Sequence, residues 1–236
     1  MTHKLTTYTL GDSAVTADLG SGISEQLNEK VIAMQQWLAK HPFEGMKELV
    51  LAYSSLTVYY DLFTIKKKYQ PPIIHKWVEE KLREAFDKSP ESMGKQGDLH
   101  HIPVCYEAQY ANDLESMAEL KQLSREKIID LHTSKQYRVY MIGFLPGFPY
   151  MGEVDLQLVQ ARKPKPSPVK AGSVGIAGSQ TGIYPFNSPG GWNIIGRTPY
   201  NLFNVELATP VWLKPGDQVK FYAIGGEEFE AIKSKM

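Results

Sequence analysis

The density of glycine and proline in the second half of the chain constrains the fold more than any other feature. Residues 143–191 contain nine Gly and seven Pro, whereas residues 1–100 contain six Gly and four Pro. Proline removes a backbone donor and glycine carries a large conformational entropy, so helices are not expected to survive at this density. The sequence therefore predicts short strands and structured loops in this region, arranged as a β-barrel or a β-sandwich.

The first hundred residues predict a small α/β unit. Gly11-Asp12 is a turn-forming pair in hairpin position, Ser24 can cap a helix that Pro42 closes, and Pro72 opens a second amphipathic helix. Strands are expected at 5–10, 14–19, 48–53 and 57–61. The resulting order ββαββα favours two helices on one face of a small antiparallel sheet.

A change in character after His100 predicts a second domain. Residues 89–94, Ser-Pro-Glu-Ser-Met-Gly, have the composition of a linker, so we expect domains at 1–95 and 96–236. Leu123 and Ile128 occupy the positions of a hydrophobic staple across a Ser124 cap. The expected elements are strands at 102–106, 137–144 and 218–224, helices near 113–120 and from 124, and a turn at 214–217.

Composition excludes several classes of function. The 26 Lys and Arg cancel the 26 Asp and Glu, which argues against binding to nucleic acid or an anionic membrane. Cys105 is the single cysteine, so an intramolecular disulfide and a cysteine-rich zinc site are excluded, and a reducing cytoplasm is the expected location. The start of the chain lacks the apolar region of a signal peptide, and the uncharged stretch 171–196 is too polar to span a bilayer.

Two segments have the composition of a binding pocket. Residues 143–152, Gly-Phe-Leu-Pro-Gly-Phe-Pro-Tyr-Met-Gly, combine stiff backbone with three aromatic rings and suit either a preformed wall or a tightly turned core segment. Residues 171–196 carry many hydroxyls, amides and glycines, which suits a pocket that orients a small polar ligand with neutral hydrogen bonds. Neither a GxGxxG fingerprint nor a P-loop is present in this stretch.

Two arginines flank these segments and are candidates for holding an anion. Arg138 and Arg197 offer paired donors that suit a carboxylate or a phosphate, although a single arginine is more often structural. The basic, proline-rich loop 162–170 is expected to be a solvated face, with the alternative that it draws an anion toward the pocket.

The histidines and the cysteine are weaker candidates for chemistry. His132 could act as a general acid or base, although a histidine at a helix end is more often a cap or a packing residue. His100 and His101 would point apart on a strand, so no metal site is predicted. Cys105 is expected to be a small buried hydrophobe.

The chain resembles the family of the 5-oxoprolinase B subunit, also called the KipI family or the allophanate hydrolase subunit 1 domain. The resemblance rests on Phe-Leu-Pro-Gly-Phe-Pro-Tyr at 144–150, Gly-Ser-Val-Gly-Ile-Ala-Gly at 172–178 and Ser-Pro-Gly-Gly-Trp at 188–192. Further matching stretches are 102–106, 131–134, 137–152, 171–198 and 213–217. They cover most of the second domain, whereas the first domain agrees in length and element order only.

The resemblance implies a fold and an activity. The fold is a small ferredoxin-like α/β domain followed by a cyclophilin-like β-barrel. The activity is an ATP-dependent opening of 5-oxoproline to glutamate, in which the chain acts with the A subunit and with a homologous C subunit. The B and C subunits would serve the phosphorylation of the lactam, with ATP and Mg²⁺ shared between partners. Two alternatives stay open: an inhibitor of a sensor histidine kinase, and an allophanate-linked module of a urea pathway.

The resemblance also implies pocket residues. In this sequence they are Arg138, Phe144, Phe148, Tyr150, Gln180, Tyr184, Ser188, Trp192 and Arg197. Arg138 or Arg197 would hold the substrate carboxylate or the transferring phosphate. Gln180 and Ser188 would orient polar groups, the aromatic side chains would pack on the ring, and His132 is a further acid–base candidate.

Overall fold

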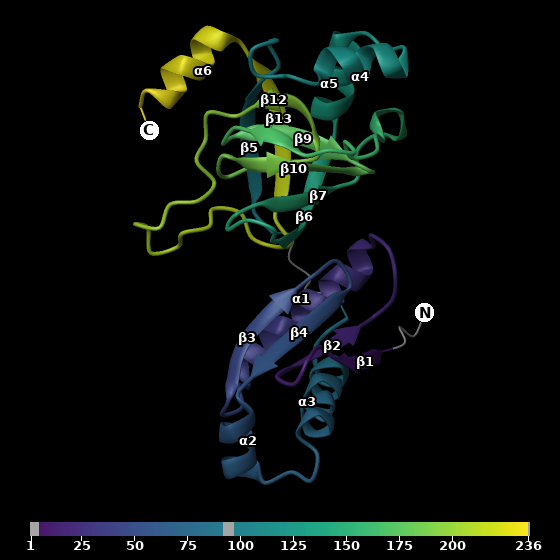
Figure 1. The fold of residues 1–236 in the computed structure, drawn as a ribbon, viewed down its shortest axis with the longest axis vertical. Helices are drawn as coiled ribbons and strands as arrows, with labels where there is room; N and C mark the ends of the chain where they lie inside the picture. The colour runs from purple at the N-terminus through teal and green to yellow at the C-terminus, as the bar shows by residue number, and fades with distance from the viewer. Residues whose placement is uncertain (1–4, 92–96, 236) are drawn as a thin grey trace. The chain divides into compact units, whose positions relative to one another are not determined.

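A computed structural model describes residues 5–91 and 97–235 and divides the chain into two compact units, residues 1–96 and 97–236 (Figure 1). Residues 92–94 of the expected linker lie outside the described residues. Among the described residues, no helix has both the length and the apolar character needed to cross a membrane.

The first unit is a four-stranded antiparallel sheet in the order β1-β2-β4-β3, packed against helices. Its elements are β1 (Thr6–Thr9), β2 (Ala14–Asp18), α1 (Glu25–Lys40), β3 (Met46–Leu51), β4 (Ser55–Tyr60), α2 (Leu62–Tyr69) and α3 (Ile74–Lys88). The four expected strands and the two expected long helices are confirmed. Ser24 caps α1 as predicted, because its Oγ accepts a hydrogen bond from the Leu27 N–H at 3.4 Å.

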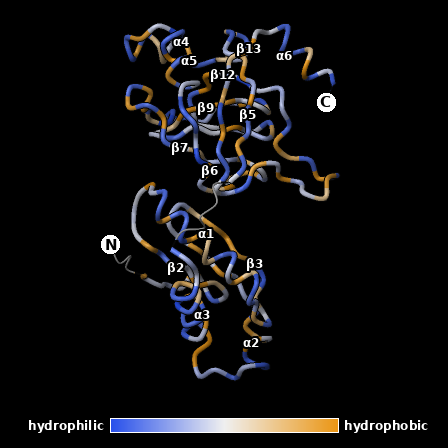
Figure 2. The backbone as a smooth tube through the Cα atoms, turned by 180° about the vertical axis from the view of Figure 1, so that it is seen from behind, coloured by the Kyte–Doolittle hydropathy of each residue, from blue (hydrophilic) through white to orange (hydrophobic). Residues whose placement is uncertain are grey.

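One face of this sheet carries the core of the unit. Val15 and Ala17 on β2 lie two positions apart, as do Leu56 and Val58 on β4, and all four belong to one buried cluster. The same cluster contains Val31, Met34 and Leu38 of α1 with Val78, Leu82 and Ala85 of α3. Figure 2 shows hydrophobic and hydrophilic residues intermixed along α3, as expected for a helix with one buried face.

The short helix α2 was not predicted. Asp61 caps it by accepting a hydrogen bond from the Thr64 N–H at 2.8 Å, but the run Lys66–Lys68 conceals the helical pattern. The observed order ββαββαα differs from the βαββαβ order of a ferredoxin-like fold. The ferredoxin-like assignment of this unit therefore stays a prediction.

The second unit is a closed barrel of seven strands in the order β10-β7-β6-β13-β5-β12-β9, with helices outside it. Its elements are β5 (Leu99–Cys105), α4 (Leu114–Lys121), α5 (Arg125–Ser134), β6 (Gln136–Ile142), β7 (Pro149–Gly152), the 3₁₀ turn η1 (Leu156–Leu158), β8 (Ser167–Val169), β9 (Ser173–Ala177), β10 (Gln180–Ile183), β11 (Ser188–Gly190), β12 (Asn193–Arg197), β13 (Gln218–Ile224) and α6 (Gly226–Lys233). The mixed α/β class and the barrel are confirmed, and the cyclophilin-like subtype stays a prediction.

Local signals in this unit behave as expected. Between residues 143 and 191 the helical structure is limited to the single turn η1, as the glycine and proline density predicts. Ser124 caps α5 through the Lys127 N–H at 3.1 Å, and Leu123 packs against the cluster that contains Ile128. Beside the barrel, β8 and β11 pair as a separate two-stranded ribbon.

Candidate functional site

The second unit contains a pocket of about 660 Å³ beside the ribbon of β8 and β11. Its wall combines the β6–β7 loop, β7, β10, the segment after β10, the loop after η1 and the end of β11. The side chains that matter below are Phe144, Tyr150, Arg162, Gln180, Tyr184 and Trp192. Segments that lie up to 48 residues apart in the chain, from 144 to 192, thus converge on one hollow.

A cluster of aromatic rings forms the floor of this pocket. The Phe148 ring is fully buried, and its centroid lies 4.8 Å from that of Tyr150, 5.1 Å from that of Tyr184 and 5.2 Å from that of Trp192. Phe144 meets Phe148 edge-on at 5.7 Å. Edge-to-face pairs of this kind are favourable beyond the area that they bury, so these contacts stabilise the floor.

Two glycines allow the rings to pack this closely. A Cβ at Gly190 would lie 2.4 Å from the Tyr184 hydroxyl oxygen, and a Cβ at Gly182 would lie 2.8 Å from Cζ of Phe148. Neither distance is compatible with a side chain. The glycine content of this stretch therefore serves the aromatic packing as well as the turns.

Phe144 is held in a strained backbone conformation at the edge of the pocket. Its φ is +67°, in the left-handed region that costs non-glycine residues of order 1–3 kcal/mol. The Gly143 N–H donates to the Phe148 carbonyl at 3.1 Å, and the Leu145 N–H donates to the Gly143 carbonyl at 2.8 Å, which closes the loop around it. The side chain is 62% exposed, so the loop holds an aromatic ring out at the pocket edge.

Arg162 is the cation of this pocket, and two backbone anchors hold its segment in place. Gln160 forms an isolated bridge with Gly178, and the Lys163 N–H donates to the Gly191 carbonyl at 2.7 Å. A Cβ built on Gly191 would lie 3.5 Å from Nε and Nη2 of Arg162, which places the guanidinium against this glycine.

The Arg162 guanidinium has no carboxylate partner in the part of the chain that the structure describes. Within residues 5–91 and 97–235 no hydrogen bond or ion pair to Arg162 is formed, and the pocket lining contains no Asp or Glu. Burial raises the pKa of the Tyr150 and Tyr184 phenols, and the positive charge of Arg162 opposes this rise in both. Neighbouring Lys163, in contrast, donates to Asp113 Oδ2 at 2.8 Å. The pocket thus presents one available positive charge beside an aromatic floor.

Comparison with known proteins identifies the family. A family model described as carboxyltransferase domain, subdomain C and D, matches residues 5–213. The 5-oxoprolinase B subunit of Bacillus subtilis is 40% identical over 100% of this chain and 99% of its own length. The 5-oxoprolinase B subunit of Haemophilus influenzae is 38% identical over 92% of this chain and 97% of its own length. The chain belongs to the family of the 5-oxoprolinase B subunit.

Solved structures and longer relatives of the family extend this comparison. The protein in the crystal structure of TTHA0988 has 34% sequence identity to this chain, and the two structures superpose with a TM-score of 0.77. The match covers 90% of this chain and 40% of that chain. This chain therefore corresponds to less than half of that longer protein. The urea amidolyase of Saccharomyces cerevisiae is 31% identical over 51% of this chain, which corresponds to 7% of that protein.

Most of the residues suggested by the family resemblance come together in the structure. Phe144, Tyr150, Gln180, Tyr184 and Trp192 line the pocket, and Phe148 lies beneath them. Ser188 sits on β11 beside the pocket but does not line it. Its Oγ is buried and has no hydrogen-bond partner within the described part of the chain.

The two arginines named from the sequence are not at this pocket. Arg197, on β12, donates from Nε to the Ala171 carbonyl at 2.7 Å and lines a different hollow. Arg138 is buried on β6, where it lies opposite Gln218 of β13 and Gly152 of β7. The expectation that either arginine flanks the aromatic pocket is corrected, because strand pairing directs both elsewhere. Arg162, which the sequence placed only in a basic loop, occupies that position.

His132 lies in the barrel core and not at the pocket. Its Nδ1 is 2.8 Å from the Tyr106 hydroxyl and its Nε2 is 3.0 Å from Thr181 Oγ1, and its ring stacks on Phe221. Because the Thr181 hydroxyl donates to the Gly175 carbonyl, one neutral tautomer satisfies both contacts: Nε2–H donates and Nδ1 accepts. Burial lowers the pKa of His132 to about 3, which suits a packing residue and not an acid–base catalyst.

We expect His132 to make the barrel acid-sensitive. The unfolded chain binds a proton near pH 6.5 whereas the folded chain does not until about pH 3, so stability is lost as the pH falls through this range. Between these two pH values, the contribution of His132 to the free energy of unfolding should fall by up to about 1.4 kcal/mol for each unit that the pH falls. Hydrogen exchange of the β6 amides, recorded at a series of pH values, measures this dependence of stability on pH. His132→Gln should flatten the slope, and His101→Gln, at an exposed position on β5, should not; equal slopes in all three proteins would refute this account.

Three groups of the metal-ligand type meet away from the pocket. Asp98, His100 and Asp217 have ligand atoms within 4.8 Å of one another, so His100 is grouped with two carboxylates and not with His101. Asp217 Oδ2 lies 3.1 Å from Nε2 of His100 and accepts from the Lys214 N–H, and Lys214 Nζ donates to Asp98 at 2.9 Å. These contacts fix the turn before β13. The absence of a metal site stays a prediction.

The strain at Phe144 predicts an inverted order of stability. Phe144→Gly should be more stable than Phe144→Ala by about 1 kcal/mol, because alanine still pays for the left-handed backbone and glycine does not. Chemical denaturation of the two variants measures the difference. If the backbone at this position were unstrained, the glycine variant would be the less stable of the two. A glycine variant less stable than the alanine variant would therefore show that the φ of +67° is absent in solution.

Proposed function

We propose that this chain belongs to an ATP-dependent 5-oxoprolinase complex and that its aromatic pocket holds the lactam. The enzyme would open 5-oxoproline to glutamate with the A and C subunits, and the chain would be inactive alone. The observation that carries the proposal is the pairing of one available guanidinium, Arg162, with an aromatic floor in a pocket that contains no carboxylate. A small lactam ring with a single carboxylate has complementary chemistry.

Each part of 5-oxoproline has a counterpart in the pocket. Its carboxylate would accept hydrogen bonds from the Arg162 guanidinium, whose planar fork suits two oxygens. Its ring would lie against Tyr150 and Trp192, whose centroids are 5.8 Å apart. The amide of Gln180 carries both donor and acceptor groups, as does a lactam, and would orient the reacting carbonyl.

The chain would serve the phosphorylation half of the reaction. A lactam carbonyl is a poor electrophile, and transfer of the γ-phosphoryl group to its oxygen makes the ring carbon open to water. The new bond joins the lactam oxygen to γ-phosphorus, and the bond to the leaving oxygen of ADP breaks. Water would then add to the ring carbon, and the C–N bond would break as the ring nitrogen takes a proton, which leaves an acyl phosphate. A second water would add to the same carbon and release phosphate, which gives the glutamate carboxylate. The pocket would position the lactam oxygen for this transfer.

ATP and Mg²⁺ would be shared with a partner. The pocket wall lacks the carboxylates that usually accompany Mg²⁺, so phosphate oxygens or a partner would supply its ligands. The relatives are named as the B component of 5-oxoprolinase, which implies partner subunits, and TTHA0988 is a longer chain of which this one spans 40%. The partners would be the A subunit and a C subunit with a homologous barrel, and we expect the complex in the cytoplasm.

Reconstitution tests the proposal. The purified chain is mixed with the A and C subunits, ATP, Mg²⁺ and 5-oxoproline, and glutamate is measured against mixtures that lack one component. Glutamate formation should require every component. Formation without this chain would overturn the proposal. If, in addition, the chain suppressed autophosphorylation of a sensor histidine kinase, the alternative role as a kinase inhibitor would replace it.

A further inference from the structure

A second, smaller hollow of about 270 Å³ lies in the barrel unit, away from the aromatic pocket. It is lined by Ala171, Gly172, Arg197, Thr198, Pro199, Tyr200, Asn201 and Lys233. None of these residues lines the aromatic pocket, and none is acidic. The lining thus contains two cations and several neutral donors.

Arg197 is fixed in orientation within this hollow. Its Nε donates to the Ala171 carbonyl at 2.7 Å, and its guanidinium carbon lies 5.9 Å from the centre of the Phe229 ring. Nε is thereby committed to the backbone, whereas the terminal nitrogens make no hydrogen bond within the described residues. An arginine held by Nε and an aromatic ring is preorganised to donate with its remaining nitrogens.

Lys233 brings a second positive charge to the same place. Its Nζ lies 5.9 Å from the centre of the Phe229 ring, the ring that Arg197 also approaches. Neither cation has a carboxylate partner among residues 5–91 and 97–235. Two like charges that approach one buried ring repel each other, and an anion between them would remove that repulsion.

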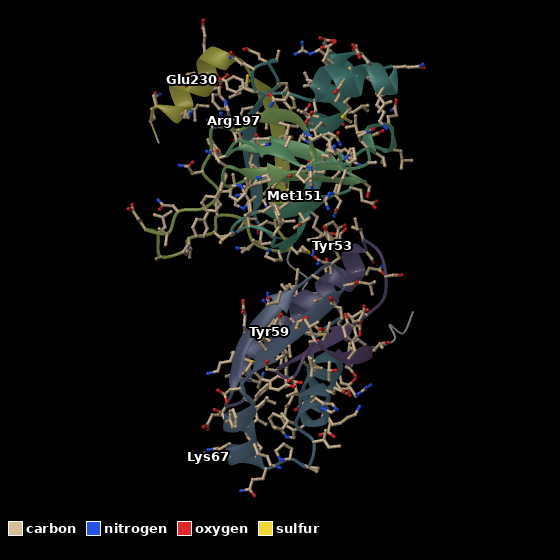
Figure 3. The ribbon with its side chains drawn as sticks, viewed as in Figure 1. Tyr53, Tyr59, Lys67, Met151, Arg197 and Glu230 are labelled. Atoms are coloured by element: carbon tan, nitrogen blue, oxygen red, sulfur yellow. The ribbon has the colours of Figure 1, made fainter. Side chains whose placement is uncertain are left out.

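An acidic side chain of the same helix as Lys233 has its own hydrogen-bond partner. Glu230, on α6, accepts a hydrogen bond from the Tyr110 hydroxyl at 2.7 Å and lines a separate hollow with Glu107. Figure 3 shows Arg197 and Glu230 on the side of the barrel that carries α6. Among residues 5–91 and 97–235, Glu230 forms no ion pair with Arg197 or Lys233.

Neutral groups complete the hollow. Thr198 Oγ1 accepts from the Tyr200 N–H at 3.2 Å, which leaves the hydroxyl proton to donate, and Asn201 adds an amide. Gly172 has a φ of +82°, and a Cβ there would lie 2.3 Å from the Thr198 carbonyl oxygen. The backbone thus closes this part of the wall, and the Thr198 hydroxyl and the Asn201 amide add neutral donors.

We propose that this hollow binds a phosphate group, carried by inorganic phosphate or by a nucleotide. Phosphate carries close to two negative charges at neutral pH, which matches two cations, and its tetrahedral oxygens accept from several directions at once. A carboxylate, with one charge and a planar shape, would leave one cation unpaired. The inference does not depend on lactam binding at the aromatic pocket.

Phosphate binding to the full chain tests this inference. Inorganic phosphate, AMP and ATP are titrated at constant ionic strength, and affinity is measured by calorimetry with amide shifts observed by NMR. Shifts should appear at Gly172, Thr198 and Lys233. Lys233→Met, at an exposed position, should weaken phosphate binding about tenfold, and Arg197→Lys should weaken it while keeping the charge. Lys165→Met, which removes a charge outside the hollow, is the matched control.

The outcomes separate the sources and the alternatives. Similar affinity for phosphate and ATP would identify a phosphate subsite, and tighter binding of AMP and ATP would identify a nucleotide; both support the inference. Equal loss in Lys233→Met and Lys165→Met, or shifts confined to the aromatic pocket, would overturn it. Arg162→Gln should leave phosphate binding unchanged, so failure here is distinguishable from failure of the lactam proposal.

Discussion

Arg162→Gln is expected to raise the KM of the reconstituted enzyme for 5-oxoproline by about 10- to 150-fold. A hydrogen bond to a charged group contributes about 1.5–3 kcal/mol, and tenfold corresponds to about 1.4 kcal/mol. The carboxylate does not change during lactam phosphorylation, so its contact stabilises ground and transition states alike. The loss should therefore fall on KM, with kcat little changed.

Lys165→Gln is the matched control for this variant. Lys165 carries the same charge in the same basic loop, is exposed, and does not line the pocket. Its KM should stay within about twofold of the parent when the ionic strength is fixed. If both variants raised KM equally, the effect would be general attraction by the loop; if Arg162→Gln left KM unchanged, the carboxylate assignment would be refuted.

Phe148→Ala is expected to destabilise the barrel unit by about 3–5 kcal/mol, the range for removal of a fully buried phenyl ring. The ring is 0% exposed and is the common neighbour of four aromatic side chains, so its loss leaves a cavity under the pocket that the remaining rings cannot fill. Urea denaturation followed through barrel amide signals measures the change. Phe148→Leu should fall between the parent and the alanine variant.

Phe63→Ala provides the comparison on the first unit. Phe63 is 86% exposed on α2, so its truncation should change the free energy of unfolding by less than about 0.5 kcal/mol. A small effect of Phe148→Ala, comparable to that of Phe63→Ala, would show that the aromatic floor is not packed as described. If Phe148→Leu lowered the free energy of unfolding strongly but left the KM for 5-oxoproline unchanged, Phe148 would support the fold of the barrel without contributing to substrate binding.

Features governed by neighbouring residues could be read from the sequence. The Ser24 and Ser124 caps and the Lys214–Asp217 hydrogen bond each join residues three positions apart. The two segments that carry most of the pocket residues were also singled out by their unusual composition, and the family resemblance named the individual aromatic residues. Local chemistry was sufficient for the caps and for the two segments.

Features governed by long-range pairing could not be read in this way. The face on which Arg197 emerges depends on the pairing of β12 with β9, where the register shifts between Ile194 and Gly196, and such irregularities redirect side chains. The helix α6 begins at two glycines and is capped by Glu107, whose Oε1 accepts from the Gly226 N–H at 2.7 Å across 119 positions. Neither partner is visible in a linear pattern.

A crystal structure of the assembled complex with bound 5-oxoproline tests the central claim most directly. We expect the lactam ring against Tyr150 and Trp192, with its carboxylate on the Arg162 guanidinium. Electron density for the lactam at the hollow of Arg197 and Lys233, or on a different protein of the complex with the aromatic pocket empty, would contradict the account.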